Sequence, residues 1–262
     1  MPVIDYELRG DRATVTITNP ELRNALTLDT AQELTDAFEA IEESDASCVV
    51  LEGSSGTFCA GGDIELMMEG LTSERETSEL MEEAAYPINQ TVQRVYECPL
   101  PTVAKVDGPA YGAGASLAIA CDVVLASEQA EISFGFRRVG LSVDSGTSYL
   151  LPRMVGENTA KDLVYSGDVL DAAAAEELGL FNRVYPTEEF EERAGDYIEN
   201  VATGPTVGLQ HSKRLLQRGL DRSFDEVIDA EVDAIGSVFE TDDFAEGVEA
   251  FLEGRTPEFD GR

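Results

Sequence analysis

The chain has 262 residues, of which 43% are hydrophobic, so it can bury a full-sized core and is not a disordered protein. Its 52 acidic residues against 18 basic ones give a formal net charge of −34, and the basic stripe that nucleic-acid-binding proteins need is missing. The acidic residues are spread over the expected helices, whereas a patch for a basic partner would cluster them. This distribution indicates a solvated surface adapted to high salt, where mobile ions screen the repulsion.

Cysteine and histidine are too few and too scattered to indicate a disulfide framework, a zinc site or a histidine-based triad. The four cysteines, which we expect to be buried free thiols, are Cys48, Cys59, Cys98 and Cys121. His211 is the only histidine, and its amphipathic surroundings predict a surface residue. The sequence therefore predicts no metal site. The start of the chain lacks the features of a secretory signal and no stretch approaches transmembrane length, so we expect a cytoplasmic protein without a membrane partner.

The first part of the chain predicts strands that alternate with helices. The expected elements are paired strands at 6–9 and 13–18, a helix at 29–43, a buried strand at 48–51 and a loop of small residues at 52–64. Residues 65–96 are acidic and helical in tendency, with a break at Pro87. Because this stretch follows the small-residue loop, two interpretations stay open: a mobile cover over a site, or a plain solvated helix.

Residues 108–122 join two apolar, strand-like runs at 102–106 and 123–126. The segment 112–115 consists of glycine and alanine, so little side chain keeps a ligand away from the backbone. An apolar run from Ser116 predicts a buried helix. Exposed amides at a helix start would form an anion site, whereas close packing would explain the same composition equally well.

The rest of the chain is mostly helical. The expected elements are helices at 158–165 and 172–177, a last strand at 181–185, and helices from residue 187 onward with breaks at 204–205 and 219. Together the elements predict an α/β chain of repeated ββα units over 1–199, followed by a helical region over 200–262. A doubly wound dinucleotide-binding fold is disfavoured, because no Gly-x-Gly-x-x-Gly follows the first strand.

Five motifs occur in order along nearly the whole chain. They are Arg23-Asn-Ala-Leu26, the segment Thr57 to Ile64 with its Ala-Gly-Gly-Asp, the segment Val106 to Asp122, Gly140-Leu-Ser-Val-Asp-Ser-Gly146, and the segment Ala250 to Phe259. Together they resemble the crotonase superfamily, the enoyl-CoA hydratase/isomerase family. The resemblance implies a spiral of ββα turns, a C-terminal helical region for trimerisation, and a homotrimer or hexamer. It implies an acyl-CoA thioester as the partner, with coenzyme A as part of the substrate and no separate cofactor.

The resemblance also assigns roles to particular residues. The N–H groups of Gly62 and Ala113 would form an oxyanion hole for the thioester oxygen as an enolate develops, and a donor in such a hole is typically worth ~3–4 kcal/mol. The expected substrate and coenzyme A contacts are Arg23 and Ala25 at the nucleotide, Ala60, Gly61, Asp63 and Ile64 along the thioester and pantetheine, Ser116 and Phe136 near the acyl group, and Arg255 near the adenine of a neighbouring subunit. Tyr111 is a further expected contact with the substrate or coenzyme A. An ordinary surface arginine is the alternative for Arg23 and Arg255.

The reaction depends on the side chains that face the acyl carbons. Hydratases of this family carry two glutamates, and the corresponding positions here are Ser116 and Phe136, neither of which can act as a base. Hydration is therefore disfavoured. Asp144 instead matches the Gly-Leu-x-Pro-Asp segment of enoyl-CoA isomerases, with Val143 in place of the proline. There the aspartate moves a proton between C2 and C4.

Other interpretations of Asp144 stay open. It could be a loop or helix-cap residue without a catalytic role. In a dehalogenase branch of the family an aspartate at this place is a nucleophile, but that branch relies on a histidine, and His211 lies in the wrong region. Three functions remain: an isomerase with Asp144 as the base, a hydratase whose carboxylate we have not located, and a non-catalytic acyl-CoA-binding subunit.

Overall fold

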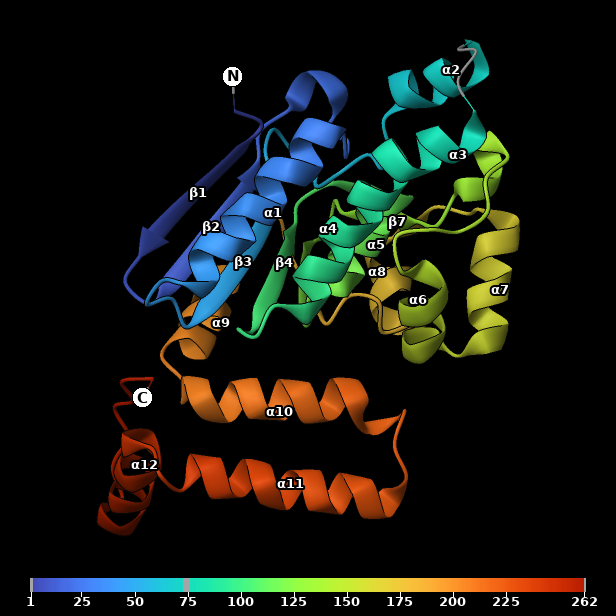
Figure 1. The fold of residues 1–262 in the computed structure, drawn as a ribbon. Helices are drawn as coiled ribbons and strands as arrows, with labels where there is room; N and C mark the ends of the chain where they lie inside the picture. The colour runs from blue at the N-terminus through green and yellow to red at the C-terminus, as the bar shows by residue number, and fades with distance from the viewer. Residues whose placement is uncertain (1, 73–75, 262) are drawn as a thin grey trace.

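The computed structural model describes residues 2–72 and 76–261, and its central element is a six-stranded sheet (Figure 1). The strands follow the order β1-β2-β3-β4-β6-β9. Their bounds are β1 Ile4–Arg9, β2 Arg12–Ile17, β3 Cys48–Gly53, β4 Thr102–Val106, β6 Val123–Ser127 and β9 Arg183–Tyr185. The first two form the predicted antiparallel hairpin, and every later pairing is parallel. Parallel neighbours need crossover connections, which is why helices separate these strands along the chain.

Helices cover both faces of this sheet (Figure 1). On one face lie α1 (Leu28–Glu42) and α4 (Tyr86–Glu97), and on the other lies α9 (Phe190–Ala202). The predicted apolar face of α1 is confirmed, because Leu34, Phe38 and Ile41 are fully buried. Thr27 begins α1 by accepting a hydrogen bond from the Thr30 N–H, which satisfies one of the free amides of the first turn.

A second, three-stranded sheet and a buried helix lie beside the first sheet. The strands are β5 (Pro109–Tyr111), β7 (Glu131–Ser133) and β8 (Leu170–Asp171), in the order β5-β7-β8. Between β5 and β6 runs α5 (Ala113–Ala120), every residue of which is buried. The helix begins three residues before the predicted start at Ser116. Gly112, with a φ of +53°, makes the turn that allows Ala113 to be the first helical residue.

Further short helices and helical turns lie between the strands of the two sheets. They are α2 (Ile64–Thr72), α3 (Thr77–Leu80), a π-helical turn at Met81–Ala85, a 3-10 turn at Phe136–Val139, α6 (Thr147–Val155), α7 (Glu157–Ser166) and α8 (Ala172–Glu177). The predicted break at Pro87 is not present: helical structure continues from Thr77 through the π-helical turn into α4, and this turn lies directly before Pro87, whose missing N–H cannot make an intrahelical bond. Residues 73–75 of the expected acidic cover lie outside the described residues.

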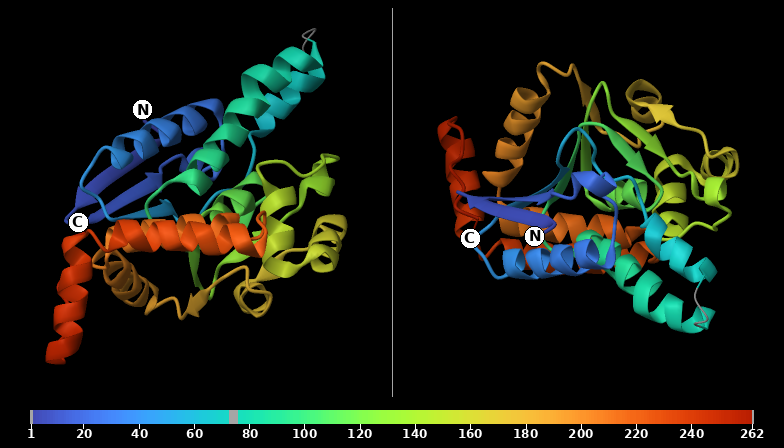
Figure 2. Two further views of the ribbon diagram at one scale, coloured as in Figure 1. Left: turned by 60° about the horizontal axis from the view of Figure 1, so that its bottom comes forward. Right: turned by 90° about the horizontal axis from the view of Figure 1, so that it is seen from above.

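The chain ends in three helices, α10 (Thr206–Gly219), α11 (Phe224–Val238) and α12 (Asp242–Glu253). They lie at the opposite end of the molecule from α2 and α3 (Figures 1 and 2). The expected boundary at residue 200 falls inside α9, whose Ile198 and Ala202 are buried against the sheet. In the structure the helical extension therefore begins with α10. Within the described ranges, no helix is both long and apolar enough to cross a bilayer.

Candidate active site

A cavity of about 220 Å³ opens where the small-residue loops, α2, the 3-10 turn and the loop before α6 meet. Its lining residues are Ala60, Gly61, Gly62, Ile64, Met67, Tyr111, Gly112, Ala113, Ser133, Gly135, Phe136, Arg138, Val139, Leu141, Asp144 and Val169. Eight of the residues expected to contact substrate are among them, so segments far apart in the sequence form one site. A larger groove, of about 840 Å³, lies between α4 and α10 and contains no predicted site residue.

Backbone hydrogen bonds hold the two glycine-rich loops together at this cavity. The N–H groups of Phe58 and Cys59 donate to the carbonyl of Pro109 at 3.1 and 3.2 Å, and the Tyr111 N–H donates to the Cys59 carbonyl at 3.0 Å. A further bond runs from the Leu26 N–H to the Gly61 carbonyl at 2.8 Å. These bonds place both loops and the Arg23–Leu26 motif at fixed positions relative to one another.

Two glycines make this close approach possible. A Cβ at Gly114 would lie 2.2 Å from the carbonyl oxygen of Cys59, and one at Gly61 would lie 2.7 Å from that of Tyr111. Gly61 also has a φ of +102°, which other residues rarely adopt. Both contacts are with backbone atoms, which cannot move aside as a flexible side chain can. The close packing that was one explanation for the glycine and alanine residues at 112–115 is therefore present.

The same packing leaves two amides at the cavity. Gly62 and Ala113 both line it, and neither N–H donates a hydrogen bond to another of the described residues. Ala113 is the first residue of α5, whose opening amides carry the positive end of the helix dipole. Both residues therefore line the cavity with backbone amides that have no partner among the described residues.

Asn24 is a structural residue near the site that the sequence analysis did not single out. It is fully buried with a φ of +57°, and its Nδ2 donates to the carbonyls of Ser54 and Thr57 at 2.9 and 2.7 Å. Its Oδ1 accepts from the Asn19 N–H at 3.0 Å. Asparagine is one of the few residues that tolerate a left-handed conformation, and this was the available sequence signal. These bonds fix the loop that carries Arg23, which is exposed outside the cavity.

Asp144 is the only acid among the described residues that line the cavity. Burial raises the pKa of its carboxyl above the ordinary value of 3.8, and the neighbouring Ser145 hydroxyl opposes part of this rise. The apolar residues Phe136, Val139 and Leu141 line the same cavity. A carboxylate with a raised pKa in such surroundings is suited to taking up and returning a proton.

Tyr111 brings a second carboxylate close to the cavity. Its hydroxyl donates to the Glu131 carboxylate, and burial together with Glu131 raises the pKa of Tyr111 to about 12. Tyr111 therefore stays protonated at neutral pH. Glu131 itself is not among the lining residues, and the sequence analysis did not identify it.

Several predicted site residues lie outside the cavity. Ser116 is fully buried, its hydroxyl pairs with that of Thr147, and it is not among the residues that line the cavity. Asp63 caps α2 by accepting from the Glu65 N–H at 2.8 Å. Ala25 is buried beside Asn24. Arg255, two residues beyond α12, binds Glu246 and Glu253, and α12 lies at the opposite end of the molecule from α2, which contributes to the cavity (Figure 1).

The described residues contain no group of three or more His, Cys, Asp or Glu side chains that could hold a metal ion. The four cysteines are free and buried, as predicted. Burial raises the pKa of the Cys48 and Cys59 thiols to about 12, so neither is a reactive thiolate at neutral pH.

Comparison with known proteins identifies the family. The Enoyl-CoA hydratase/isomerase profile matches residues 10–262, which is nearly the whole chain. The chain belongs to the enoyl-CoA hydratase/isomerase family. The resemblance found in its motifs is thereby confirmed.

Some relatives within this family are named hydratases and others isomerases. A probable enoyl-CoA hydratase of Rhodobacter capsulatus is 35% identical over 99% of this chain and 98% of its own length. The 1,2-epoxyphenylacetyl-CoA isomerase of Escherichia coli is 32% identical over 95% of both chains. The crystal structure of a putative enoyl-CoA hydratase from Streptomyces coelicolor is 34% identical and superimposes with a TM-score of 0.92 over 99% of this chain and 94% of that one. The predicted crotonase-like α/β fold is confirmed, and the choice of reaction rests on the residues of the site.

Proposed function

We propose that this protein is an enoyl-CoA isomerase, in which Asp144 moves a proton between C2 and C4 of a 3-enoyl-CoA. The observation that carries the proposal is that Asp144 is the single acid among the described cavity-lining residues. Isomerisation needs only one proton carrier, whereas the family's hydration reaction uses two carboxylates. Phe136, which is 5% exposed, occupies one of those two positions and keeps water away from it.

The reaction begins when the Asp144 carboxylate removes a proton from C2. The electrons of the C2–H bond move into the thioester, and the N–H groups of Gly62 and Ala113 hold the resulting dienolate oxygen in an oxyanion hole. The protonated Asp144 then returns the proton to C4, which leaves the double bond between C2 and C3. No water or separate cofactor takes part. A raised pKa lets one carboxyl act first as a base and then as an acid.

Substrate binding follows the same assignment. Arg23 and the backbone at Ala25 bind the nucleotide of coenzyme A, and the segment 60–64 lines the path of the pantetheine. The assembly is a homotrimer or hexamer, in which Arg255 approaches the adenine site of a neighbouring subunit. Five apolar side chains that are more than three-quarters exposed on α10 to α12 support such an assembly: Leu216, Leu220, Phe224, Phe251 and Leu252.

The test compares Asp144→Asn with Asp162→Asn, which changes an exposed aspartate of α7. We expect Asp144→Asn to abolish conversion of a 3-enoyl-CoA into the 2-enoyl form while binding of the thioester is retained. Asp162→Asn should leave turnover unchanged. Unchanged turnover in Asp144→Asn would rule out the proposed base.

A hydratase is the second candidate, favoured by the Glu131 carboxylate that binds Tyr111 beside the cavity. Incubation with crotonyl-CoA in ¹⁸O-labelled water distinguishes the two reactions. A 3-hydroxyacyl product carrying ¹⁸O would establish hydration, and our proposal predicts its absence. A non-catalytic acyl-CoA-binding subunit would instead exchange no α-proton of a bound thioester for deuterium.

A further inference from the structure

The loop that carries Asp144 is held from one side by Asn89 of α4. The Ser145 N–H donates to Asn89 Oδ1 at 2.6 Å, and Asn89 Nδ2 donates to the Ala85 carbonyl at 2.7 Å. Because a backbone N–H can only donate, the amide oxygen must be the atom that faces Ser145, and the second bond fixes the amide in that orientation.

Ser145 has a conformation that requires such support. It is fully buried, and its φ of +51° lies in the left-handed region, which is unfavourable for serine. Its hydroxyl has no partner of normal geometry among the described residues. A strained backbone of this kind persists only where surrounding contacts determine it. Without Asn89 the Ser145 N–H would be a buried donor without an acceptor. The loop would then lower its free energy by rearranging so that this N–H finds another partner.

The opposite side of the loop is tied to α5. Thr147 donates to the Asp144 carbonyl from its N–H at 2.9 Å and from its Oγ1 at 2.7 Å, and the same Oγ1 pairs with Ser116 Oγ. Because the Thr147 hydroxyl donates its proton to Asp144, the Ser116 hydroxyl of α5 is the donor in this pair. The helix whose first amide is that of Ala113 is therefore also connected to the backbone of Asp144.

We propose that Asn89 is a positioning residue for Asp144, which it holds against the clamp formed by Ser116 and Thr147. The inference rests on the proposed function, because it gives Asn89 a role in the proton transfer. Asn89 binds the N–H of Ser145, the residue directly after Asp144, and does not itself line the cavity. Its contribution is to the position of the carboxylate relative to the two amides, where a shift of 1 Å is typically worth about 100-fold in rate.

The test uses three variants of α4. Asn89→Leu removes the acceptor, and we expect kcat for a 3-enoyl-CoA to fall about 30- to 100-fold with KM nearly unchanged. Asn89→Asp keeps an acceptor for the Ser145 N–H but loses the donor to the Ala85 carbonyl, so it should restore only part of that loss. Gln93→Leu, one turn further along α4 at an exposed position, is the matched control and should behave as the parent protein. A residue that served only general stability would show neither the separation of kcat from KM nor the rescue.

Hydrogen–deuterium exchange of the peptide containing residues 144–147 provides a readout that is independent of turnover. Asn89→Leu should increase exchange in this peptide, and Gln93→Leu should not. Unchanged exchange and unchanged kcat in Asn89→Leu would overturn the inference. An inactive parent protein with the same exchange difference would overturn the proposed function while supporting Asn89 as the residue that holds this loop against the Ser116–Thr147 clamp.

Discussion

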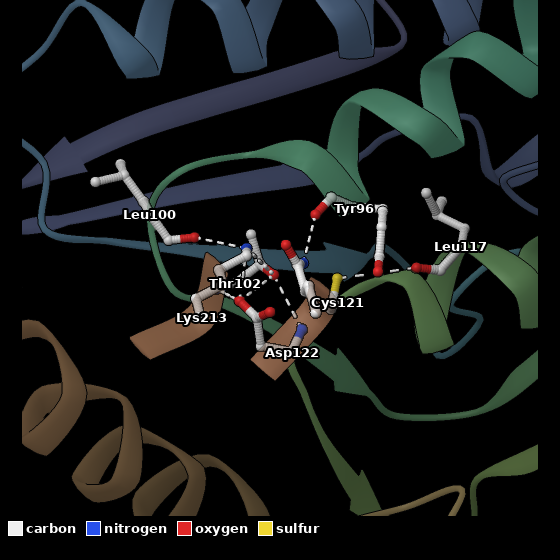
Figure 3. Close-up of polar contacts among 8 residues, drawn as sticks. Tyr96, Leu100, Thr102, Leu117, Cys121, Asp122 and Lys213 are labelled. Carbon is white, nitrogen blue, oxygen red and sulfur yellow. Dashed lines mark hydrogen bonds and ion pairs between the residues drawn. The ribbon is translucent and has the colours of Figure 1, made fainter. Parts of the chain in front are cut away.

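Lys213 Nζ lies 2.7 Å from Asp122 Oδ2, in an ion pair that joins α10 to the segment between α5 and β6 (Figure 3). The lysine side chain is only 7% exposed, and its Nζ also donates to the Leu100 carbonyl at 2.9 Å. Asp122 Oδ2 accepts from both the N–H and the hydroxyl of Thr102. The C-terminal helices are thus attached to the core through a buried polar cluster, in a chain that has only three lysines.

Removing this lysine should destabilise the protein measurably. Lys213→Met leaves the Asp122 carboxylate without its cation, and we expect a loss of about 3 kcal/mol in the free energy of unfolding. This is the lower end of the range for a buried pair, because Asp122 keeps its bonds to Thr102. Urea unfolding measures the loss. Lys161→Met, which breaks an exposed pair with Glu157, should change the free energy by less than about 0.5 kcal/mol. Equal losses of unfolding free energy in the two variants would show that the Lys213–Asp122 pair contributes no more than an exposed ion pair.

A methyl group at Gly61 should separate the two loops at the cavity. Gly61→Ala would place its Cβ 2.7 Å from the Tyr111 carbonyl oxygen in an unfavourable φ, so the Gly62 amide has to move. We expect a loss of about 100-fold in kcat, the value of one misplaced oxyanion donor. Steady-state kinetics measure this loss. Gly236→Ala, on α11 with nothing near the added methyl, should keep full activity and gain up to about 1 kcal/mol of stability. Full activity in Gly61→Ala would show that the amide position is not critical.

The pH dependence of turnover should report the raised pKa of Asp144. The reaction needs the carboxylate, so kcat/KM should decline as the pH falls through a value above the ordinary 3.8. The folded protein favours the neutral carboxyl more than the unfolded chain does, so Asp144→Asn should be the more stable protein at neutral pH, and this gain should disappear in acid. A pH–rate profile and urea unfolding at two pH values check the two statements. A decline at the ordinary aspartate value would refute the effect of burial.

The net charge of −34 predicts that salt stabilises this protein. At about 1 M salt the Debye length is roughly 3 Å, so repulsion between acidic surface residues is largely screened. We expect the midpoint of thermal unfolding to rise between about 0.1 and 2 M potassium chloride. A neutral osmolyte at matched water activity is the control, because it leaves repulsion unscreened. Similar gains from salt and osmolyte would assign the effect to hydration and not to charge.

The expected elements agree with the structure where the pattern is local. The apolar run at 102–106 is β4, and the alanine-rich run at 172–177 is α8, each with the expected bounds. The start of α5 was placed too late, because glycine and alanine at 112–115 suit a loop and a helix equally well. Only the packing of Gly114 against Cys59 decides between them. Residues 144–147 gave no signal that Asn89, 56 positions away, holds the loop.

The sequence by itself determined the family, the charge of the surface and the segments that meet at the cavity, because motifs, composition and periodicity are properties of neighbouring residues. The tertiary structure decided which side chains face the cavity. Ser116 lies on a helix that is buried all round, so no amphipathic pattern could show that it turns toward Thr147. Likewise, the free amides of Gly62 and Ala113 come together only through hydrogen bonds between loops about 50 residues apart.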